Sequence, residues 1–244
     1  MKRLENKVII VTGAAQGMGK THVEKLLAEG ARVAITDINK ELGEQVSKAL
    51  GENTIFIQHD VVNESDWQNV VNIVMNKWGH IDVLINNAGI TYNTPLEELS
   101  LENYMKIVNV NQVSVFLGMK TVASIMKAQK NGSIINVSSM NGLVGGAIGY
   151  TDTKFAVRGM TKAASRELSP HNIRVNSVHP GVIQTSMLEQ EGVKEQVEQF
   201  KTTIPMRRVA QTEEVSNMII FLSSEESSYS TGSEFVIDGG LTAL

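Results

Sequence analysis

Two side chains beyond the middle of the chain, Tyr150 and Lys154, have the types and the spacing of a proton-transfer pair. We expect residues 150–168 to form a helix, which places the phenol and the ammonium on one face. A phenol with a pKa near ~10 is a poor base at neutral pH, and a fixed cation beside it favours the phenolate. Two hydroxyls, those of Ser138 and Ser139, precede the pair. The stretch could therefore exchange a proton with a ligand, although a helix-face aromatic and a solvated cation are the structural alternatives.

The overall composition limits the partners of such a site. The 244 residues are 42% hydrophobic, enough for one buried core, and 22 basic against 26 acidic residues give a net charge of −4 without a basic run. A nucleic-acid or anionic-membrane surface is therefore not expected, and small uncharged partners are favoured. The absence of cysteine excludes disulfides, thiolate zinc and thiol nucleophiles, and we predict no metal site. The sequence shows neither a signal-peptide pattern nor an apolar run of about 18 residues, which predicts a cytoplasmic protein.

A glycine-rich turn follows the first predicted strand. Residues 7–12 are a β-branched run without polar alternation, which is typical of a strand buried on both faces of a parallel sheet. Gly13, Gly17 and Gly19 come next and open a helix, with the spacing Gly-x3-Gly-x-Gly. Positions without side chains let a diphosphate approach the backbone amides and the positive end of that helix. The turn predicts a phosphate site, with an ordinary glycine turn as the alternative.

Asp37 stands at the end of the next predicted strand, residues 32–36, and 18 residues after Gly19. An acidic residue at this place can bind the ribose hydroxyls of an adenosine and would repel a 2′-phosphate. Asp37 therefore predicts NAD rather than NADP as the cofactor. A helix cap is the alternative role, because another helical segment follows.

Strands and helices alternate through the first half of the chain. Predicted strands at 54–57 and 81–85 flank a helix at 64–78, and this alternation indicates a right-handed βαβ series in one doubly wound, parallel α/β sheet. Ligands of such sheets bind beyond the carboxyl ends of the strands. Four candidate residues fall at these ends, namely Gly13, Asp37, Asp60 and Asn87.

The second half of the chain contains the proton-transfer pair and a predicted lid. Residues 140–149 include four glycines and no charged residue, so this segment can approach a ligand without charging it. Residues 184–206 interrupt the alternation, and we interpret them as an active-site lid, with a plain surface helix as the alternative. The other expected elements are helices at 97–109, 110–127 and 212–223, strands at 133–137, 174–178 and 234–237, and a turn at residues 179–181.

Six motifs make the chain similar to the short-chain dehydrogenase/reductase family over nearly its whole length. The resemblance implies one Rossmann-like domain over residues 1–244 with about seven strands, a nicotinamide cofactor, and hydride exchange with an alcohol or carbonyl. Residues 1–90 would mainly bind the dinucleotide, and residues 91–244 would supply catalysis and the substrate site. The motifs are Thr12-Gly13-x3-Gly17-Met18-Gly19, Asn86-Asn87-Ala88-Gly89, Asn111 within residues 110–116, Ser139, Tyr150-x3-Lys154 and His179-Pro180-Gly181.

The resemblance also implies roles for individual residues. Tyr150 would be the general acid/base, Ser139 would orient the substrate oxygen, and Lys154 would hold the nicotinamide ribose and lower the phenol pKa. Asn111 would distort its helix and hold a water molecule of the proton relay. The family spacing favours Asn111 over Asn109, and it likewise favours Ser139 over Ser138. The implied cofactor contacts are Gly13, Gln16, Gly17, Met18, Gly19, Asp37, Ile38, Asp60, Val61, Asn87, Ala88, Gly89, Val110, Tyr150, Lys154, Pro180, Gly181, Ile183 and Thr185, and the implied substrate contacts are Ser139, Val144, Tyr150, Met187 and Leu188.

The expected pocket wall is apolar and has no arginine for a substrate carboxylate, which favours a hydrophobic secondary alcohol and its ketone. The chain looks most like bacterial hydroxysteroid dehydrogenases and related secondary-alcohol dehydrogenases. A 3-oxoacyl-thioester (acyl-carrier-protein) reductase and a non-catalytic dinucleotide-binding protein are the alternatives. The motif departs from the family at Asp152 and Thr153, where a small residue and a serine are usual, and His179 is expected to be a turn residue rather than a base. The family also implies a homotetramer.

Overall fold

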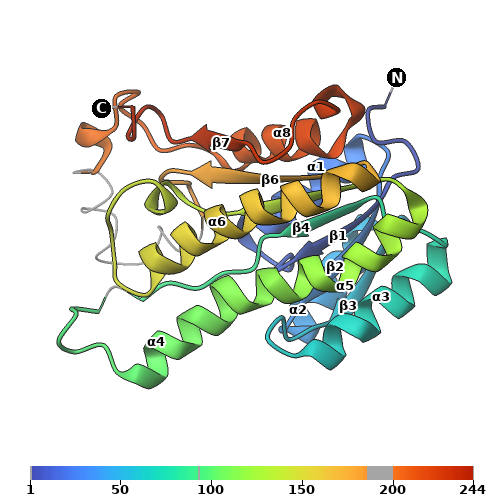
Figure 1. The fold of residues 1–244 in the computed structure, drawn as a ribbon, viewed down its shortest axis with the longest axis horizontal. Helices are drawn as coiled ribbons and strands as arrows, with labels where there is room; N and C mark the ends of the chain where they lie inside the picture. The colour runs from blue at the N-terminus through green and yellow to red at the C-terminus, as the bar shows by residue number, and fades with distance from the viewer. Residues whose placement is uncertain (1, 93, 186–199, 244) are drawn as a thin grey trace.

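The computed structural model describes residues 2–92, 94–185 and 200–243. Seven strands within these ranges form one parallel β-sheet. Its strands are β1 (Val8–Thr12), β2 (Arg32–Asp37), β3 (Thr54–Gln58), β4 (Val83–Asn86), β5 (Gly132–Val137), β6 (Ile173–Pro180) and β7 (Glu234–Ile237). Their order across the sheet is β3-β2-β1-β4-β5-β6-β7, with every neighbouring pair parallel (Figure 1). The order reverses between β1 and β4, which is where sheets of this type bind ligands. The predicted doubly wound, Rossmann-like sheet is confirmed.

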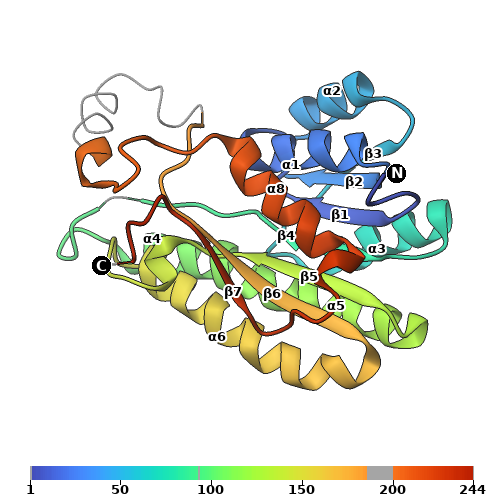
Figure 2. The same ribbon diagram turned by 90° about the horizontal axis from the view of Figure 1, so that it is seen from above.

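Helices cover both faces of the sheet. One face carries α1, α2 and α8, and the opposite face carries α3, α5 and α6, so that the sheet is the middle of three layers (Figure 2). Among the described helices, none is both long enough and apolar enough to cross a membrane. The helices are α1 (Gly17–Ala28), α2 (Lys40–Leu50), α3 (Glu64–Trp78), α4 (Leu101–Val108), a π-helical turn (Asn109–Val113), α5 (Ser114–Gln129), α6 (Tyr150–Leu168) and α8 (Thr212–Ser223), with short 3₁₀ turns at Met140–Gly142, Ser169–His171 and Glu225–Ser227.

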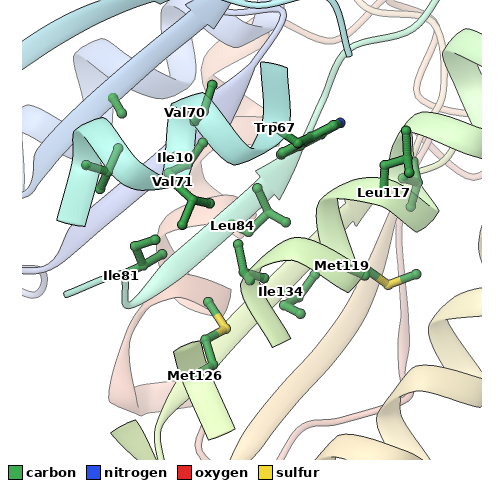
Figure 3. Packing of buried hydrophobic residues seen from close by; sticks show 14 of the residues in the cluster. Ile10, Trp67, Val70, Val71, Ile81, Leu84, Leu117, Met119, Met126 and Ile134 are labelled. Carbon is green, nitrogen blue, oxygen red and sulfur yellow. The ribbon is translucent and has the colours of Figure 1, made fainter. Parts of the chain in front are cut away.

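Each face of the sheet has its own hydrophobic core. On the α3 and α5 side, Trp67 and Val71 from α3 and Met126 from α5 pack on Leu84 and Ile134 of the strands (Figure 3). The other core joins α1 and α8 to the opposite strand face. The central strands are buried on both sides, and all five residues of β1 are buried. This burial explains why β1 is a continuous apolar run rather than an alternating one.

Most predicted boundaries agree with the structure, and two differ in an informative way. Residues 97–127, expected as two helices, form one rod from Leu101 in which the π-helical turn joins α4 to α5. Strand β6 continues to Pro180, so the predicted turn at residues 179–181 is wrong: His179 is a buried strand residue. Most of the predicted lid, residues 186–199, lies outside the described residues.

Candidate active site

The glycine turn lies between β1 and the first turn of α1, and its glycines are required by their surroundings. Gly13 has a φ of +61°, and a Cβ there would lie 2.9 Å from the Ala88 Cα. A Cβ on Gly19 would collide with the Gly13 carbonyl oxygen and would stand 2.7 Å from the Asn87 Nδ2. Gly17, with a φ of +56°, is different, because no described atom lies within 4 Å of the place for its Cβ. The turn therefore packs tightly on the end of β4 and leaves an open approach at the start of α1.

This open approach has the chemistry of an anion site. Among the described residues, no side chain accepts a capping hydrogen bond at Gln16, the N-cap of α1. The first backbone N–H groups of this helix therefore have no side-chain cap. Asn87 donates its Nδ2 to the carbonyls of Thr12 (2.9 Å) and Gly13 (3.1 Å), and its buried Oδ1 has no hydrogen-bond partner among the described residues. An acceptor left unpaired at a ligand-binding edge is suited to a hydroxyl group of a ligand. The glycine turn and Asn87 together are therefore suited to a dinucleotide, the turn to its phosphates and Asn87 to a hydroxyl group.

Asp37 completes the dinucleotide half of the site. Its Oδ2 accepts a hydrogen bond from the Ala15 amide (3.1 Å) and its Oδ1 accepts one from the Asn39 amide (3.0 Å). The cap of α2 is Asn39, which accepts the Leu42 amide, so the helix-cap alternative for Asp37 is wrong. Ile38 beside it is 64% exposed although apolar, as a residue that covers a flat ligand would be.

The end of β3 lies next to Asp37, since the His59 amide donates to the Asp37 carbonyl (2.9 Å). Asp60 and Val61 follow there. The Asp60 Oδ1 accepts from the Val62 amide (3.2 Å), and the Val61 carbonyl accepts the indole N–H of Trp67 (2.9 Å). The residues predicted to surround an adenine thus gather at one edge of the sheet.

The proton-transfer pair lies on the first turn of α6. Tyr150 is the first residue of this helix, and the Lys154 Nζ lies 5.5 Å from the centre of its ring. The Lys154 side chain is buried, and its ammonium donates to the Val137 carbonyl (2.9 Å). Burial lowers the pKa of Lys154 to about 8. The pair expected from the sequence is therefore present at the end of β5.

The phenol pKa differs from what the pair alone suggests. Burial raises the pKa of Tyr150, and a hydrogen bond with the Ser139 hydroxyl offsets this only in part. In the chain by itself the phenol pKa is thus raised, not lowered as the neighbouring cation led us to expect. The physical reason is that desolvation disfavours the phenolate, while the Lys154 ammonium is directed at the Val137 carbonyl.

The two serines before the pair have different partners. The Ser138 Oγ donates to the Lys154 carbonyl (3.0 Å) and is used in holding α6. The Ser139 Oγ accepts the Asn141 amide (3.1 Å) and bonds to the Tyr150 side chain. The structure therefore places Ser139, the residue preferred from the family spacing, beside the phenol.

Asn111 lies in the π-helical turn, where the resemblance implied a distorted helix. It is fully buried, whereas Asn109 is exposed. Its amide bonds to both backbone groups of Ile90, donating to the carbonyl (2.8 Å) and accepting from the N–H (2.8 Å). Its Nδ2 also lies 3.3 Å from the Thr153 Oγ1, which donates to the Tyr150 carbonyl (2.7 Å). Asn111 thus joins the strand end after β4 to the first turn of α6.

The remaining predicted residues surround this centre. A Cβ on Gly89 would lie 3.4 Å from the Asn111 Oδ1 and 3.5 Å from the Lys154 Nζ, so the two halves of the site meet there. Gly181 packs on Asp238, and Ile183 is buried and forms a β-bridge with Ala210. Val110 lies in the π-helical turn, Pro180 ends β6, and Thr185 lies five residues beyond Pro180. Of the predicted substrate contacts, Val144 is exposed, and Met187 and Leu188 lie outside the described residues.

Sequence reasoning missed two residues of the site. Thr153 departs from the family motif, yet its hydroxyl connects Asn111 to the Tyr150 backbone. The sequence predicts His179 to be a turn residue, yet its ring contacts the Ser139 carbonyl. The position of Thr153 at i+3 from Tyr150 on the same helix face was a usable signal, whereas His179 carried none.

A doubly wound sheet with a dinucleotide cradle at its switch point and a Ser, Tyr and Lys cluster beside it defines a nicotinamide-dependent oxidoreductase. A family model described as enoyl-(acyl carrier protein) reductase matches residues 13–242. The crystal structure of gox2181 is similar, with a TM-score of 0.96, 32% sequence identity, and coverage of 99% of this chain and 98% of that one. The chain belongs to the short-chain dehydrogenase/reductase family.

Relatives that are named for several different activities are similar in sequence to this chain. It is 44% identical to a 3-alpha-(or 20-beta)-hydroxysteroid dehydrogenase of Mycobacterium bovis, over 99% of this chain and 91% of that protein. It is 43% identical to a cyclopentanol dehydrogenase of Comamonas sp., over the whole of both chains. A 3-oxoacyl-[acyl-carrier-protein] reductase of Thermotoga maritima is also 43% identical, over 98% of this chain and 99% of that one. An NADP-dependent (R)-specific alcohol dehydrogenase of Lentilactobacillus kefiri is 37% identical over 99% and 98%.

Proposed function

We propose that this protein is an NAD(H)-dependent oxidoreductase that interconverts a hydrophobic secondary alcohol and its ketone. The observation that carries the proposal is the cluster of Ser139, Tyr150 and Lys154 beside the unpaired Asn87 Oδ1 and the glycine turn. A nicotinamide cofactor bound at this edge supplies or accepts the hydride. Residues 1–90 mainly bind it, and residues 91–244 provide the catalytic groups.

The proton chemistry belongs to Tyr150. In reduction its phenol gives a proton to the substrate oxygen, and in oxidation the phenolate takes the hydroxyl proton. The Ser139 hydroxyl, already bonded to the Tyr150 side chain, orients that oxygen. Lys154, whose ammonium donates to the Val137 carbonyl here, would hold the ribose of a bound nicotinamide cofactor, and its charge would lower the phenol pKa and support the phenolate. Asn111 fixes the first turn of α6 through Thr153. The family resemblance also implies that it would hold a water molecule of the proton relay.

NAD rather than NADP is proposed on the basis of Asp37. Both of its carboxylate oxygens are held by backbone amides, which fixes a negative charge at the end of β2. A carboxylate there binds two ribose hydroxyls and repels a 2′-phosphate. A relative named as NADP-dependent shows that family membership alone leaves the cofactor open, so that Asp37 bears the argument. Steady-state kinetics with both cofactors test it, and a preference for NADP would contradict it.

The substrate proposal depends on the apolar pocket wall expected from the sequence. Val144, Ile148 and Met206 are three residues of that expected wall, and each is an exposed apolar side chain. Two relatives are named for a hydroxysteroid and for cyclopentanol, and both are secondary alcohols. An alcohol panel that contains cyclopentanol, cyclohexanol, a 3-hydroxysteroid and a short primary alcohol, assayed by NADH absorbance, tests the class. Turnover confined to the primary alcohol would contradict the proposal.

A 3-oxoacyl-thioester reductase is the second candidate, and it is favoured by the relative that bears this name. Comparing acetoacetyl thioester with cyclopentanone, each with NADH and NADPH, separates the two candidates. Faster reduction of the thioester with NADPH would favour the second one. A non-catalytic dinucleotide-binding protein is disfavoured, because Asn111, Ser139, Tyr150 and Lys154 are all present and brought together.

We also propose a cytoplasmic homotetramer. In the tetramer that the family resemblance implies, the helices of residues 97–127 and 150–168 pair across one interface. Exposed apolar side chains lie on these helices: Leu101 and Met105 on α4, Phe116 on α5 and Phe155 on α6. Val236 of β7, at the edge of the sheet, is exposed as well. Patches of this kind mark contacts between proteins. Sedimentation velocity measures the assembly, and a monomer at micromolar concentration would contradict it.

A further inference from the structure

His179 is a buried imidazole next to the candidate catalytic serine. Its Nδ1 lies 2.9 Å from the Ser139 carbonyl oxygen, and its Nε2 lies 2.9 Å from the Ser177 Oγ. A carbonyl oxygen can only accept, so the hydrogen must be on Nδ1. Burial lowers the pKa of His179, which keeps the ring neutral, and the neutral Nε2 then accepts the Ser177 hydroxyl. The two neighbours therefore fix one tautomer.

The backbone of Ser139 controls where its hydroxyl points. Ser139 is extended, with φ −169° and ψ 164°, and it begins the 3₁₀ turn Met140–Gly142. Its carbonyl accepts the Gly142 amide (2.9 Å) in addition to the imidazole. Its hydroxyl accepts the Asn141 amide (3.1 Å). The direction of the hydroxyl consequently follows the orientation of this peptide unit.

Two side chains hold the corner that contains Ser139. On one side, Ser138 donates its hydroxyl to the Lys154 carbonyl (3.0 Å), which ties the corner to α6. On the other side, the ladder between β5 and β6 ends with the Ser138 amide on the Val178 carbonyl (2.8 Å). Beyond that bond, the His179 ring makes the next connection from β6 to the corner.

We propose that His179 is a positioning residue that holds the Ser139 peptide, so that the serine hydroxyl faces Tyr150 and the substrate oxygen. This inference rests on the proposed function. His179 takes no part in proton transfer, because its hydrogen is committed to the Ser139 carbonyl and its other nitrogen to Ser177. It acts through geometry, and a displacement of about 1 Å at a reacting group can cost about 100-fold in rate.

Three substitutions separate the hydrogen bond from the space that the ring fills. His179→Asn carries an amide N–H where Nδ1 stands, and His179→Leu has the same branching without a donor. His179→Gln is polar and carries its amide near the Nε2 position, so it remains a test if the leucine variant does not fold. For each variant we measure kcat and KM for the most active alcohol of the panel, the affinity for NADH by fluorescence, and the thermal midpoint.

The leucine and glutamine variants should lose about 10- to 100-fold in kcat, with KM and NADH affinity within about threefold. The asparagine variant should recover most of the lost rate. Equal losses in the asparagine and leucine variants, or full kcat in the leucine variant, would overturn the proposal. Ser139→Ala serves as the reference, because undiminished turnover in that variant would refute the proposed function itself.

An NMR measurement checks the geometry without any turnover. Long-range ¹H–¹⁵N correlation spectra of the histidine rings should show His179 at pH 8 with its hydrogen on Nδ1, and its ring should take up a second proton only at a lower pH than a free imidazole does. A hydrogen on Nε2 would overturn the proposal, since the bond to the Ser139 carbonyl could not then exist. His179→Asn identifies the signal by its disappearance.

Discussion

Lys154→Met is expected to make the cofactor-free protein more stable while it abolishes activity. Lys154 is 4% exposed, and burial lowers its pKa to about 8 from an ordinary 10.5. This difference of about 2.5 corresponds to roughly 3 kcal/mol that folding loses by keeping the ammonium charged at pH 7. Methionine fills a similar volume without a charge. The free energy of unfolding of the Lys154→Met protein should therefore be about 2–3 kcal/mol higher than that of the wild type. The gain is smaller than the full cost of the charge because the hydrogen bond to the Val137 carbonyl is lost.

The pH dependence separates this explanation from an effect of packing. Between pH 8 and 10.5 the unfolded lysine still holds the proton that the folded lysine has released, so the wild type gains stability as the pH rises through this window. The methionine variant has no such gain at this position. Because the two proteins share all other titrating groups, the difference in their free energies of unfolding should be largest near pH 7 and nearly vanish near pH 10.

Urea unfolding followed by tryptophan fluorescence, in buffers from about pH 7 to about pH 10, measures this difference. Lys48→Met near the end of α2 is the matched control, because its side chain is exposed and its replacement should change stability by no more than about 0.5 kcal/mol. A Lys154→Met protein no more stable than the wild type at pH 7, or a difference that stays constant up to pH 10, would refute the reasoning.

Four further substitutions test the site. Tyr150→Phe should lower kcat about 100- to 10,000-fold and leave NADH affinity, measured by fluorescence, nearly intact; unchanged turnover would contradict the acid/base role. Asp37→Ser should narrow the preference for NAD over NADP in steady-state kinetics, and the expectation fails if the ratio of the two specificity constants does not move. Gly19→Ala should abolish NADH binding because its Cβ would lie 2.7 Å from the Asn87 Nδ2. Gly17→Ala should also weaken NADH binding, because its Cβ would stand in the open approach at the start of α1, but it should lower stability by only the roughly 1–2 kcal/mol of left-handed strain, measured by urea unfolding. Unchanged NADH affinity in the Gly17→Ala variant would contradict the placement of the phosphate site.

The parts of the fold that depend on local pattern were predictable from the sequence. Helix α6 begins at Tyr150 and ends at Leu168 as expected, because a glycine precedes it and apolar residues recur at helical spacing. The strands followed from β-branched runs, since burial on both faces removes polar residues from them. Asp37 and the glycine turn were located in the same way, from their place at strand ends.

The features that depend on contacts between distant segments were not predictable from the residue pattern alone. The distortion at Asn109–Val113 was expected only from the family resemblance, because the buried Asn111 in this π-helical turn bonds to Ile90, 21 residues earlier. The His179 ring meets Ser139 only because β5 and β6 are neighbours. The raised pKa of Tyr150 likewise follows from burial, which residue spacing along a helix does not report. The roles of Asn111, Ser139, Tyr150 and Lys154 in turnover stay predictions.

The strand order has a consequence for how the chain acquires its structure during synthesis. β1 lies between β2 and β4, and Ile9 is paired with Val83, about 74 residues later. At roughly 5–20 residues per second, one edge of β1 is exposed for about 4–15 s before its second partner leaves the ribosome. During this interval Val8–Thr12 is an apolar strand with a free hydrogen-bonding edge, the kind of segment that pairs with other nascent chains. Slower translation across residues 13–82 should therefore increase aggregation.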